Sequence, residues 1–275
     1  MKKLIVTGSM VLLILFGWIV LKPTDDPGLD YALIFGRNYI SYNLDNEDVR
    51  FNIFGVLENG GNLEALDQLI TDVAFNNTNM SIVDYHFDQA EAQGDYQLFN
   101  LLINVESSSN QIESSDRFII SFKDGKSREY EFGKAVVTNI NADNEIIDFP
   151  NQITVSYPYL SLNMEIHNVS SEDIVLTGIT DLANQISYSF EPEEQIQSNQ
   201  KYQIDIDFAD EVESYDFHTL TPLLNYMYDQ THQTAVMHGM IYGMFRPDEE
   251  KIELILANHN KVKLQSVGVF SYSPN

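Results

Sequence analysis

The sequence predicts an all-β protein, because runs of alternating apolar and polar residues, each bounded by turn residues, dominate residues 31–275. The run at residues 51–57 places Phe51, Ile53 and Leu57 on one face of a strand. A longer run at residues 96–105 is rich in side chains that favour strands. Period-two patterns of this kind indicate strands with one buried face.

A hairpin and a second set of strands follow. The Asp124-Gly125 pair separates the alternating runs 118–122 and 127–132, and Asp-Gly in such a position is the strongest short hairpin signal. After the polar, acidic stretch 139–150 the alternation resumes. The predicted strands of this second set are residues 153–157, 160–166, 174–179, 186–190 and 202–208.

The order of strand patterns repeats along the chain. Tyr96 and Tyr202 each open a long strand within a Tyr-Gln pair, and residues 69–73 match residues 175–179 at the same offset. Chance agreement between generic strands is the alternative, because alternating strands resemble one another by construction. We therefore predict two tandem immunoglobulin-like β-sandwich domains behind one N-terminal transmembrane helix. The predicted domains are residues 31–145 and residues 146–275.

An uncharged apolar run occupies residues 4–21, directly after Lys2 and Lys3. About 20 apolar residues cross a bilayer core, and 17 are near the lower limit. A cleaved secretory signal needs a small-residue cleavage site, which residues 22–26 lack, and a lipoprotein signal needs a cysteine, which the chain lacks. A buried core helix is a further alternative. We predict a signal anchor at residues 1–21, a linker at residues 22–30, and an extracytoplasmic remainder.

The chain is strongly acidic, with 41 Asp and Glu residues against 15 Lys and Arg residues. Two of the basic residues, Lys2 and Lys3, precede the apolar run, so the part beyond it carries a formal charge of −28. This charge excludes nucleic acid as an expected partner, because phosphates require basic contacts. It is compatible with a basic partner, with cation binding or with solubility alone. The absence of cysteine fits a bacterial surface without disulfides.

Two short helices are predicted among the strands. The first covers residues 62–70, where Asn62 caps a run with leucines at helical spacing. The second lies in the second domain at residues 221–228, where Thr221 suits the cap and Pro222 suits the first helical position. Further strands are expected at residues 235–245, 251–256 and 262–270.

Three histidines, His218, His232 and His238, fall within 21 residues, with Asp216 nearby. Zinc binds imidazole and carboxylate ligands, so these residues define an alternative function, a metal-dependent hydrolase. Surface histidines without a common ligand are the competing interpretation. The chain otherwise lacks the common catalytic signatures, including the nucleophile elbow and the phosphate-binding glycine loop.

Two other groups are candidate binding sites. Asp205, Asp207 and Asp210 stand in the densest acidic stretch and define a weak calcium site, although the glycine and ligand order of a calcium loop is missing. A solvated strand end is the alternative. Met240, Tyr242 and Met244 lie in the unusually apolar run 235–245 and define a partner-binding face, with a simple core strand as the alternative.

The sequence therefore favours a membrane-anchored extracytoplasmic binding or accessory protein of a bacterial cell surface, without enzymatic activity. The expected partners are the membrane, through the N-terminal helix, and a protein or cell-envelope polymer. No cofactor is expected apart from the weak calcium site.

Overall fold

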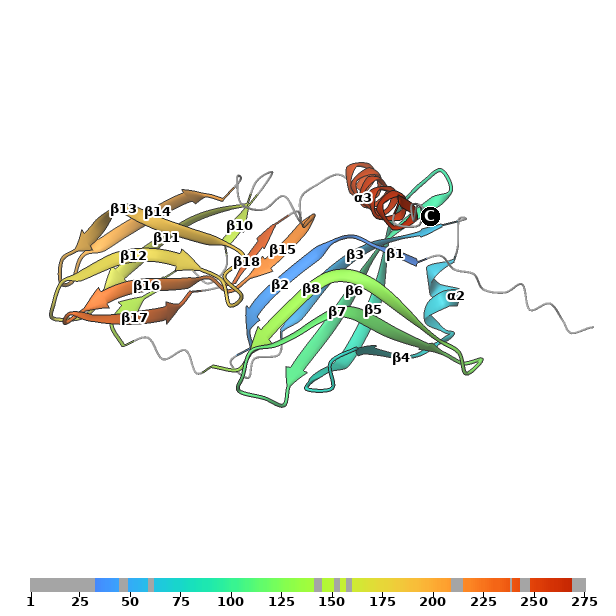
Figure 1. Cartoon of the computed structure of the whole chain (residues 1–275), viewed down its shortest axis with the longest axis horizontal. Coiled ribbons are helices and arrows are strands. Elements are labelled where there is room, and N and C mark those ends of the chain that lie inside the picture. Colours follow the sequence, from blue (N-terminus) through green and yellow to red (C-terminus); the bar gives the residue numbers. More distant parts are fainter. Residues whose placement is uncertain are drawn as a thin grey trace, which may run out of the picture. The chain divides into compact units, whose positions relative to one another are not determined.

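The computed structural model describes residues 33–44, 49–58, 62–140, 145–150, 154–156, 160–208, 215–237, 239–242 and 248–268. Strands in several sheets make up most of this part of the chain, which confirms the all-β prediction (Figure 1). The chain from Leu33 onward forms one compact unit. The expected anchor and linker lie outside the described residues. No helix among the described residues is both long and apolar enough to cross a membrane.

The first sheet has four antiparallel strands in the order β1-β3-β6-β5. Phe51, Ile53 and Leu57 are buried as predicted, but Phe54 and Val56 on the opposite face of β3 are buried too, in a cluster with Ile252 and Ile255. Leu101 and Ile103 face the same interior as Ile53 and Phe51, from the neighbouring strand. The strand bounds are β1 (Leu33–Phe35), β3 (Arg50–Glu58), β5 (Met80–Gln93) and β6 (Tyr96–Ser107).

The second sheet has seven strands in the order β10-β18-β15-β2-β8-β7-β4. Strand β2 pairs in parallel with both β8 and β15, so strands from both ends of the chain meet beside it. The strand bounds are β2 (Asn38–Asn43), β4 (Ile70–Phe75), β7 (Glu113–Phe122), β8 (Ser127–Thr138), β10 (Thr154–Ser156), β15 (Phe217–Leu220) and β18 (Met240–Tyr242).

Aromatic rings fill the space between these two sheets. The Phe35 ring of the first sheet meets the Phe118 ring of the second edge to face, with centroids 5.5 Å apart. Phe118 stacks on Phe132 at 4.1 Å, and Tyr42 meets Phe51 at 5.2 Å. Aromatic pairs in these geometries add stability beyond the area that they bury.

Two local predictions in this region are confirmed. Gly125 adopts a φ of 81°, which glycine tolerates, and its amide donates to the carbonyl of Phe122 to close the β7–β8 hairpin at 2.9 Å. The helix α2 (Leu63–Asp67) begins after Asn62, whose side chain accepts a hydrogen bond from the amide of Ala65 at 3.1 Å.

Two further sheets enclose another apolar core, rich in leucine and isoleucine and including Leu162, Ile166 and Ile204, to which Tyr39 of β2 and Val136 of β8 also belong. Their orders are β14-β11-β9 and β13-β12-β16-β17. The strand bounds are β9 (Ile147–Asp148), β11 (Ser161–Asn168), β12 (Ile174–Thr180), β13 (Ser187–Ile196), β14 (Lys201–Asp207), β16 (Leu223–Tyr228) and β17 (Thr231–Val236).

The helix predicted at residues 221–228 is wrong, because this segment forms strand β16. Leu224 and Tyr226 are buried at every second position, and β16 pairs with β12 on one side and β17 on the other. Thr221 does not cap a helix. Its hydroxyl oxygen accepts a hydrogen bond from the amide of Asn43, the last residue of β2, at 3.1 Å.

The strands predicted at residues 251–256 and 262–270 are also wrong, because the helix α3 (Asp248–Gly268) contains residues 251–256 and 262–268; residues 269 and 270 lie outside the described part. Ile252 and Ile255 are buried one turn apart against Phe54 and Phe217. Ile252, Leu254 and Leu256 occupy every second position of the same segment, and this period-two pattern explains the strand prediction. The acidic residues at the start of α3 favour a helix through its dipole.

The long strand predicted at residues 235–245 is divided between two sheets. Strand β17 ends at Val236, Met237 is buried in the C-terminal core, and β18 begins at Met240.

The division of the chain at residues 145 and 146 stays a prediction. Strands β15 and β18 follow that point but lie in one sheet with β2 and β8, and α3 packs against β1 and β3 (Figure 1). The C-terminal part of the chain therefore contributes to both cores.

Candidate functional site

A bulge in the pairing of β7 with β8 shapes the candidate site. On β7 the regular pairing stops at Ser115 and resumes at Arg117, whereas on β8 it stops at Ala135 and resumes only at Glu131. One residue of β7 therefore lies opposite residues 132–134 of β8. Bulges of this kind often lie beside functional sites, because they turn side chains out of the regular ladder.

Gly133 makes this bulge possible. Its φ of 114° suits glycine, and a Cβ atom there would lie 2.0 Å from the carbonyl oxygen of Asn38. The side chain of Asn38 is buried, and both its nitrogen and its oxygen form hydrogen bonds. Its Nδ2 donates to the carbonyl of Gly36 at 2.7 Å and to that of Phe132 at 3.3 Å, and its Oδ1 accepts from the amide of Phe54 at 3.2 Å. The Asn38 side chain thus fixes the backbone of Gly36, Phe54 and Phe132, next to the bulge.

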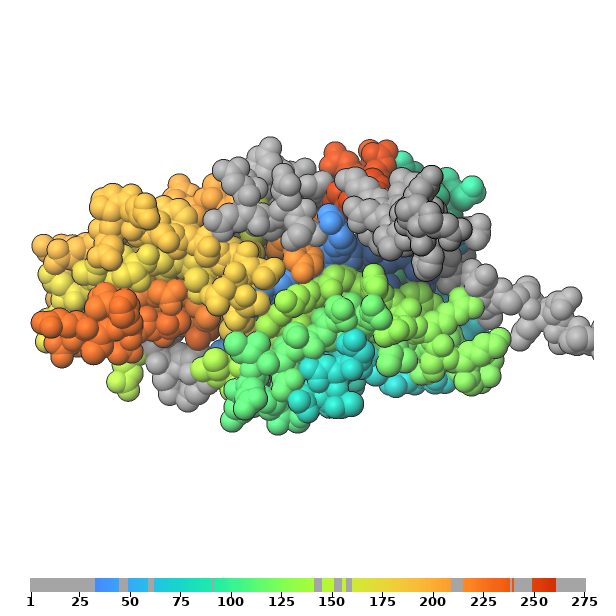
Figure 2. Space-filling view, viewed as in Figure 1, coloured from blue at the N-terminus to red at the C-terminus, as the bar shows by residue number. Residues whose placement is uncertain are grey.

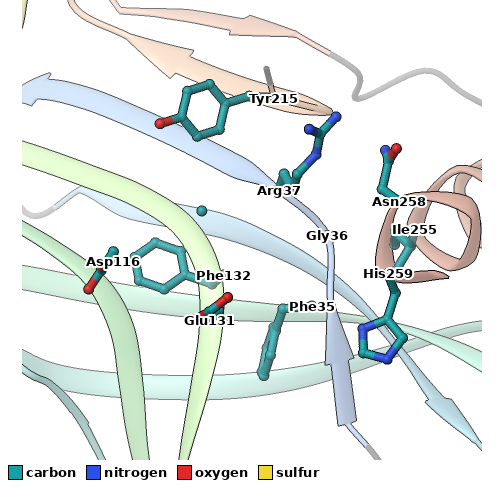
Figure 3. Close-up of a pocket in the computed structure, with 11 residues that line it drawn as sticks. Phe35, Gly36, Arg37, Asp116, Glu131, Phe132, Tyr215, Ile255, Asn258 and His259 are labelled. Carbon is teal, nitrogen blue, oxygen red and sulfur yellow. The ribbon is translucent and has the colours of Figure 1, made fainter. Parts of the chain in front are cut away.

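A surface cavity of about 280 Å³ lies on one side of the bulge. Figure 3 shows Arg37 and Tyr215 on one side of this space, Asp116 and Glu131 on another, and Asn258 and His259 projecting from α3. The complete lining is Phe35, Gly36, Arg37, Asp116, Glu131, Phe132, Gly133, Tyr215, Ile255, Asn258 and His259.

A second cavity of about 670 Å³ adjoins the first. Asp116, Gly133 and Tyr215 line both cavities, so the two form one depression centred on the bulge, which we call the bulge groove. The β7 and β8 region lies at the surface in the space-filling view, in green (Figure 2). The lining of the second cavity is Asn76, Asn77, Thr78, Ser114, Ser115, Asp116, Gly133, Lys134 and Tyr215.

Asparagine side chains fix the polar wall of the bulge groove. The Nδ2 of Asn76 donates to the Asp116 carboxylate at 3.1 Å, and the hydroxyl of Ser115 donates to the Asn76 side-chain oxygen. The Nδ2 of Asn77 donates to the Glu113 carboxylate at 3.0 Å. The hydrogen bond from Asn77 lowers the pKa of Glu113, so this carboxylate stays ionised and acts as an acceptor. These side chains are ordered before any ligand arrives.

Most charges around the groove are already paired. The Arg37 guanidinium lies 3.2 Å from the buried Asp216 carboxylate, which also accepts a hydrogen bond from Asn258 of α3. Glu131 pairs with Arg117 at 3.2 Å. The ammonium of Lys134 makes no hydrogen bond or ion pair with the part of the chain that the structure describes. Lys134 and Asp116 are therefore the charges that the groove offers to a ligand.

A buried aromatic cluster supports Tyr215. Its ring stacks on Tyr39 with centroids 4.8 Å apart, and the Tyr39 hydroxyl donates to the buried carboxylate of Asp181. Burial raises the pKa of Tyr215, and burial together with Asp181 raises that of Tyr39. Burial lowers the pKa of the adjacent His218 to about 3. At neutral pH both hydroxyls are protonated and the imidazole is uncharged.

The candidate calcium residues lie away from this groove. Asp205 and Asp207 are exposed on β14 and alternate with the buried Ile204 and Ile206, as the sequence predicts. Asp210 lies outside the described residues. Within the described ranges no group of three His, Asp or Glu side chains could hold a metal ion. The calcium site stays an untested prediction.

The candidate zinc ligands occupy different surroundings. His218 is buried on β15, in the sheet of β2, whereas His232 is exposed on β17, in another sheet. Asp216 is engaged with Arg37 and Asn258. His238 lies outside the described residues. The structure does not bring His218 and His232 together.

Met240 and Tyr242 of the expected partner-binding face belong to β18, which has β15 on one side and β10 on the other. Their side chains lie outside the described part, as does the whole of Met244. The partner-binding role of these three residues stays a prediction.

Sequence reasoning missed the groove residues Arg37, Asp116, Lys134 and Tyr215. One signal pointed toward them, because Gly133 interrupts the alternating pattern of β8, and an isolated glycine in a strand marks a bulge. The partners of that bulge come from distant parts of the chain. They could not be identified without the sheet order.

Comparison with known proteins gives no family. No family model and no curated protein matches the chain. Among solved structures, a protein of unknown function from Porphyromonas gingivalis W83 is 12% identical and covers 76% of this chain and 95% of its own, with a TM-score of 0.23. The tandem Ig repeats of Dlar are 7% identical and cover 75% and 92%, with a TM-score of 0.17. Scores this low define neither fold nor function.

Proposed function

We propose that this chain is a non-enzymatic binding protein of a bacterial cell surface. In this proposal residues 4–21 anchor it in the membrane, the remainder is extracytoplasmic, and two tandem immunoglobulin-like sandwiches carry the ligand site. The bulge groove is that site. One observation carries the proposal: two adjoining cavities share a bulge whose polar side chains are already fixed by hydrogen bonds.

The arrangement fits binding better than catalysis. A nucleophile or general base needs a partner that orients and activates it. In the bulge groove the carboxylates instead accept hydrogen bonds from asparagines or pair with arginines. Rigid, satisfied polar groups lose little freedom on binding, which favours affinity. The alternative of a metal-dependent hydrolase has no comparable support, because His218 and His232 lie in different sheets.

Site-specific photocrosslinking in intact cells tests the site. A photoreactive amino acid at Ser114, an exposed lining residue of the groove, is expected to form covalent adducts with a cell-surface component. The matched control is Ser189, an exposed serine of strand β13 that does not line the groove. Adducts from both positions, or from neither, would contradict a ligand site in the groove.

Membrane extraction tests the anchor. The intact mass of the protein extracted with detergent is expected to include residues 1–21, and protease added to spheroplasts is expected to digest residues 33–275. A mature chain that begins between residues 22 and 30 and is found in the medium would instead indicate a cleaved signal.

A further inference from the structure

We infer that the bulge groove binds an uncharged oligosaccharide chain. This inference rests on the proposed function, because it names the ligand of the same site. It follows from three properties of the groove: the chemistry of the side chains, the balance of charge, and a fixed aromatic residue.

The lining of the larger cavity consists of amides, hydroxyls, one carboxylate, one ammonium, one glycine and one tyrosine, without any aliphatic side chain. Amides and hydroxyls both donate and accept hydrogen bonds, as the hydroxyls of a sugar do. Peptides are usually bound through apolar pockets or by addition of a strand to a free sheet edge. The larger cavity has no apolar pocket, since Phe35, Phe132 and Ile255 line only the smaller cavity, and β7 has no free edge because it is paired with β4 and β8.

The charge of the groove favours a neutral ligand. The charges of Lys134 and Asp116 are opposite in sign. Arg37 is neutralised by Asp216, and Arg117 by Glu131. The whole chain carries a formal charge of −26, which repels a polyanion at long range. A polycation would be attracted to many acidic surfaces of this chain and would have no particular preference for the groove. An uncharged chain is free of both effects.

Tyr215 supplies the apolar contact that a sugar ring uses. The C–H face of a pyranose packs on aromatic side chains, whose hydroxyl also forms hydrogen bonds. Tyr215 lines both cavities and is partly exposed, and its stacking on Tyr39 fixes its position. A chain of several sugar rings could thus contact the amide wall and the tyrosine together.

Isothermal titration calorimetry of the full-length protein in nanodiscs tests this inference. The probes are neutral tetrasaccharides of glucose, mannose and N-acetylglucosamine, with tetragalacturonate as the anionic and tetralysine as the cationic comparison. At least one neutral tetrasaccharide is expected to bind, and tetragalacturonate is expected to bind at least about tenfold more weakly.

Two variants locate the binding. Ser114→Trp fills the groove and is expected to weaken binding by at least about tenfold, whereas Ser189→Trp adds the same side chain outside the groove and is expected to leave affinity unchanged. Thr78→Trp is a second blocking variant at an exposed lining residue, and serves if Ser114→Trp does not fold.

The outcomes separate this inference from the proposed function. If Ser114 photocrosslinks a polypeptide and no neutral tetrasaccharide binds at millimolar concentration, the oligosaccharide inference is overturned and the binding function stands. If neither crosslinking nor titration shows a ligand, both are overturned. Tighter binding of tetralysine or tetragalacturonate than of every neutral probe also overturns the inference.

Discussion

Two β-bulges in this chain use glycine in different ways. In the C-terminal region, β12 shifts register between Leu176 and Gly178 against both of its neighbours, β13 and β16. In the N-terminal region, the bulge at Gly133 interrupts the β7–β8 pairing, while the pairing of β8 with β2 begins at Gly133 and shows no shift as far as Thr138. A Cβ atom on Gly178 would lie 2.6 Å from the carbonyl oxygen of Tyr188, within the sheet.

The difference teaches that the neighbours of a bulge decide its role. At β12 the register shifts against both neighbours, because Thr177 has no partner on β16 and lies opposite residues 190–193 of β13, and this sheet covers the C-terminal core. At Gly133 only one neighbour is displaced, and Asp116 is left exposed at the edge of two cavities. The first bulge serves packing, and the second opens a surface site.

The largest effect is expected for Gly133→Ala. The substitution places an alanine at a positive φ, with its Cβ atom 2.0 Å from the carbonyl oxygen of Asn38. Asn38 has little room to move, because its buried side chain is hydrogen-bonded to the carbonyl of Gly36. Unfavourable backbone conformation and overpacking together are expected to destabilise the chain by about 3 kcal/mol or more. Urea denaturation of the full-length protein in detergent measures the loss. A change below about 1 kcal/mol would show that β2 and β8 are not held this closely.

Gly178→Ala sharpens the comparison, because its backbone lacks the positive φ. The contact with the Tyr188 carbonyl alone is expected to cost about 1–3 kcal/mol, measured by the same denaturation. Ligand affinity is expected to stay unchanged in this variant, whereas it should fall in Gly133→Ala. Equal loss of affinity in both variants would argue against a distinct role for the groove bulge.

A pH-dependent loss of stability is expected from His218, which contacts Tyr215 beneath the groove. Burial lowers its folded-state pKa to about 3 from 6.5, so the unfolded chain binds the proton first as the pH falls. This contribution to stability is present above pH 6.5 and is lost toward pH 3, at about 1.4 kcal/mol per pH unit in between.

The variant His218→Phe keeps a ring beside Tyr39 and Tyr215 but cannot be protonated. Its stability is expected to fall less steeply with pH than that of the native chain, as measured by urea denaturation at several pH values. The exposed carboxylates, Glu113 among them, are common to both chains and cancel in the comparison. Parallel pH profiles would contradict a neutral, buried His218.

The smallest effect is expected for Asn77→Ala, which removes three hydrogen bonds at the half-buried wall of the groove: those from Asn77 to the Glu113 carboxylate and the Ser114 carbonyl, and that from the Asn79 amide to Asn77. The free energy of unfolding should fall by only about 1 kcal/mol, because water replaces the lost partners at this partly exposed position. The pKa of Glu113 should rise toward its ordinary value, because its lowering depends first on Asn77. Carboxyl-carbon NMR titration measures this shift. An unchanged Glu113 pKa would mean that the asparagine wall is not fixed in solution.

The sequence predicted the elements that depend on local patterns. The Asp124-Gly125 hairpin and the Asn62 cap are confirmed because each is decided within a few residues. The strands of Tyr96 and Tyr202, which match in the repeat, each pair with an earlier strand of their own region, β6 with β3 and β14 with β11. In both regions the strand between them in the repeat, β4 or β12, lies in another sheet.

Contacts between distant segments decided the elements and the site that local sequence patterns did not predict. Leu220, Leu223 and Met227 lie at helical spacing, but two flanking strands recruit residues 223–228 into a sheet. Ile252, Leu254 and Leu256 alternate as in a strand, whereas Ile252 and Ile255 fit a helix, and packing on Phe54 and Phe217 selects the helix. The groove joins segments more than a hundred residues apart, from Arg37 to Asn258. No local pattern could therefore identify it.

Hydrogen–deuterium exchange of the full-length protein, with and without the neutral tetrasaccharide that binds best, tests the central claim most directly. Bound ligand is expected to slow exchange in residues 76–79, 113–117 and 131–134, which contain the wall and the bulge of the groove. Exchange in residues 174–180, around the bulge of β12, is expected to stay unchanged. Protection of residues 174–180 alone, or equal protection of both bulges, would contradict the assignment of the ligand site to the groove.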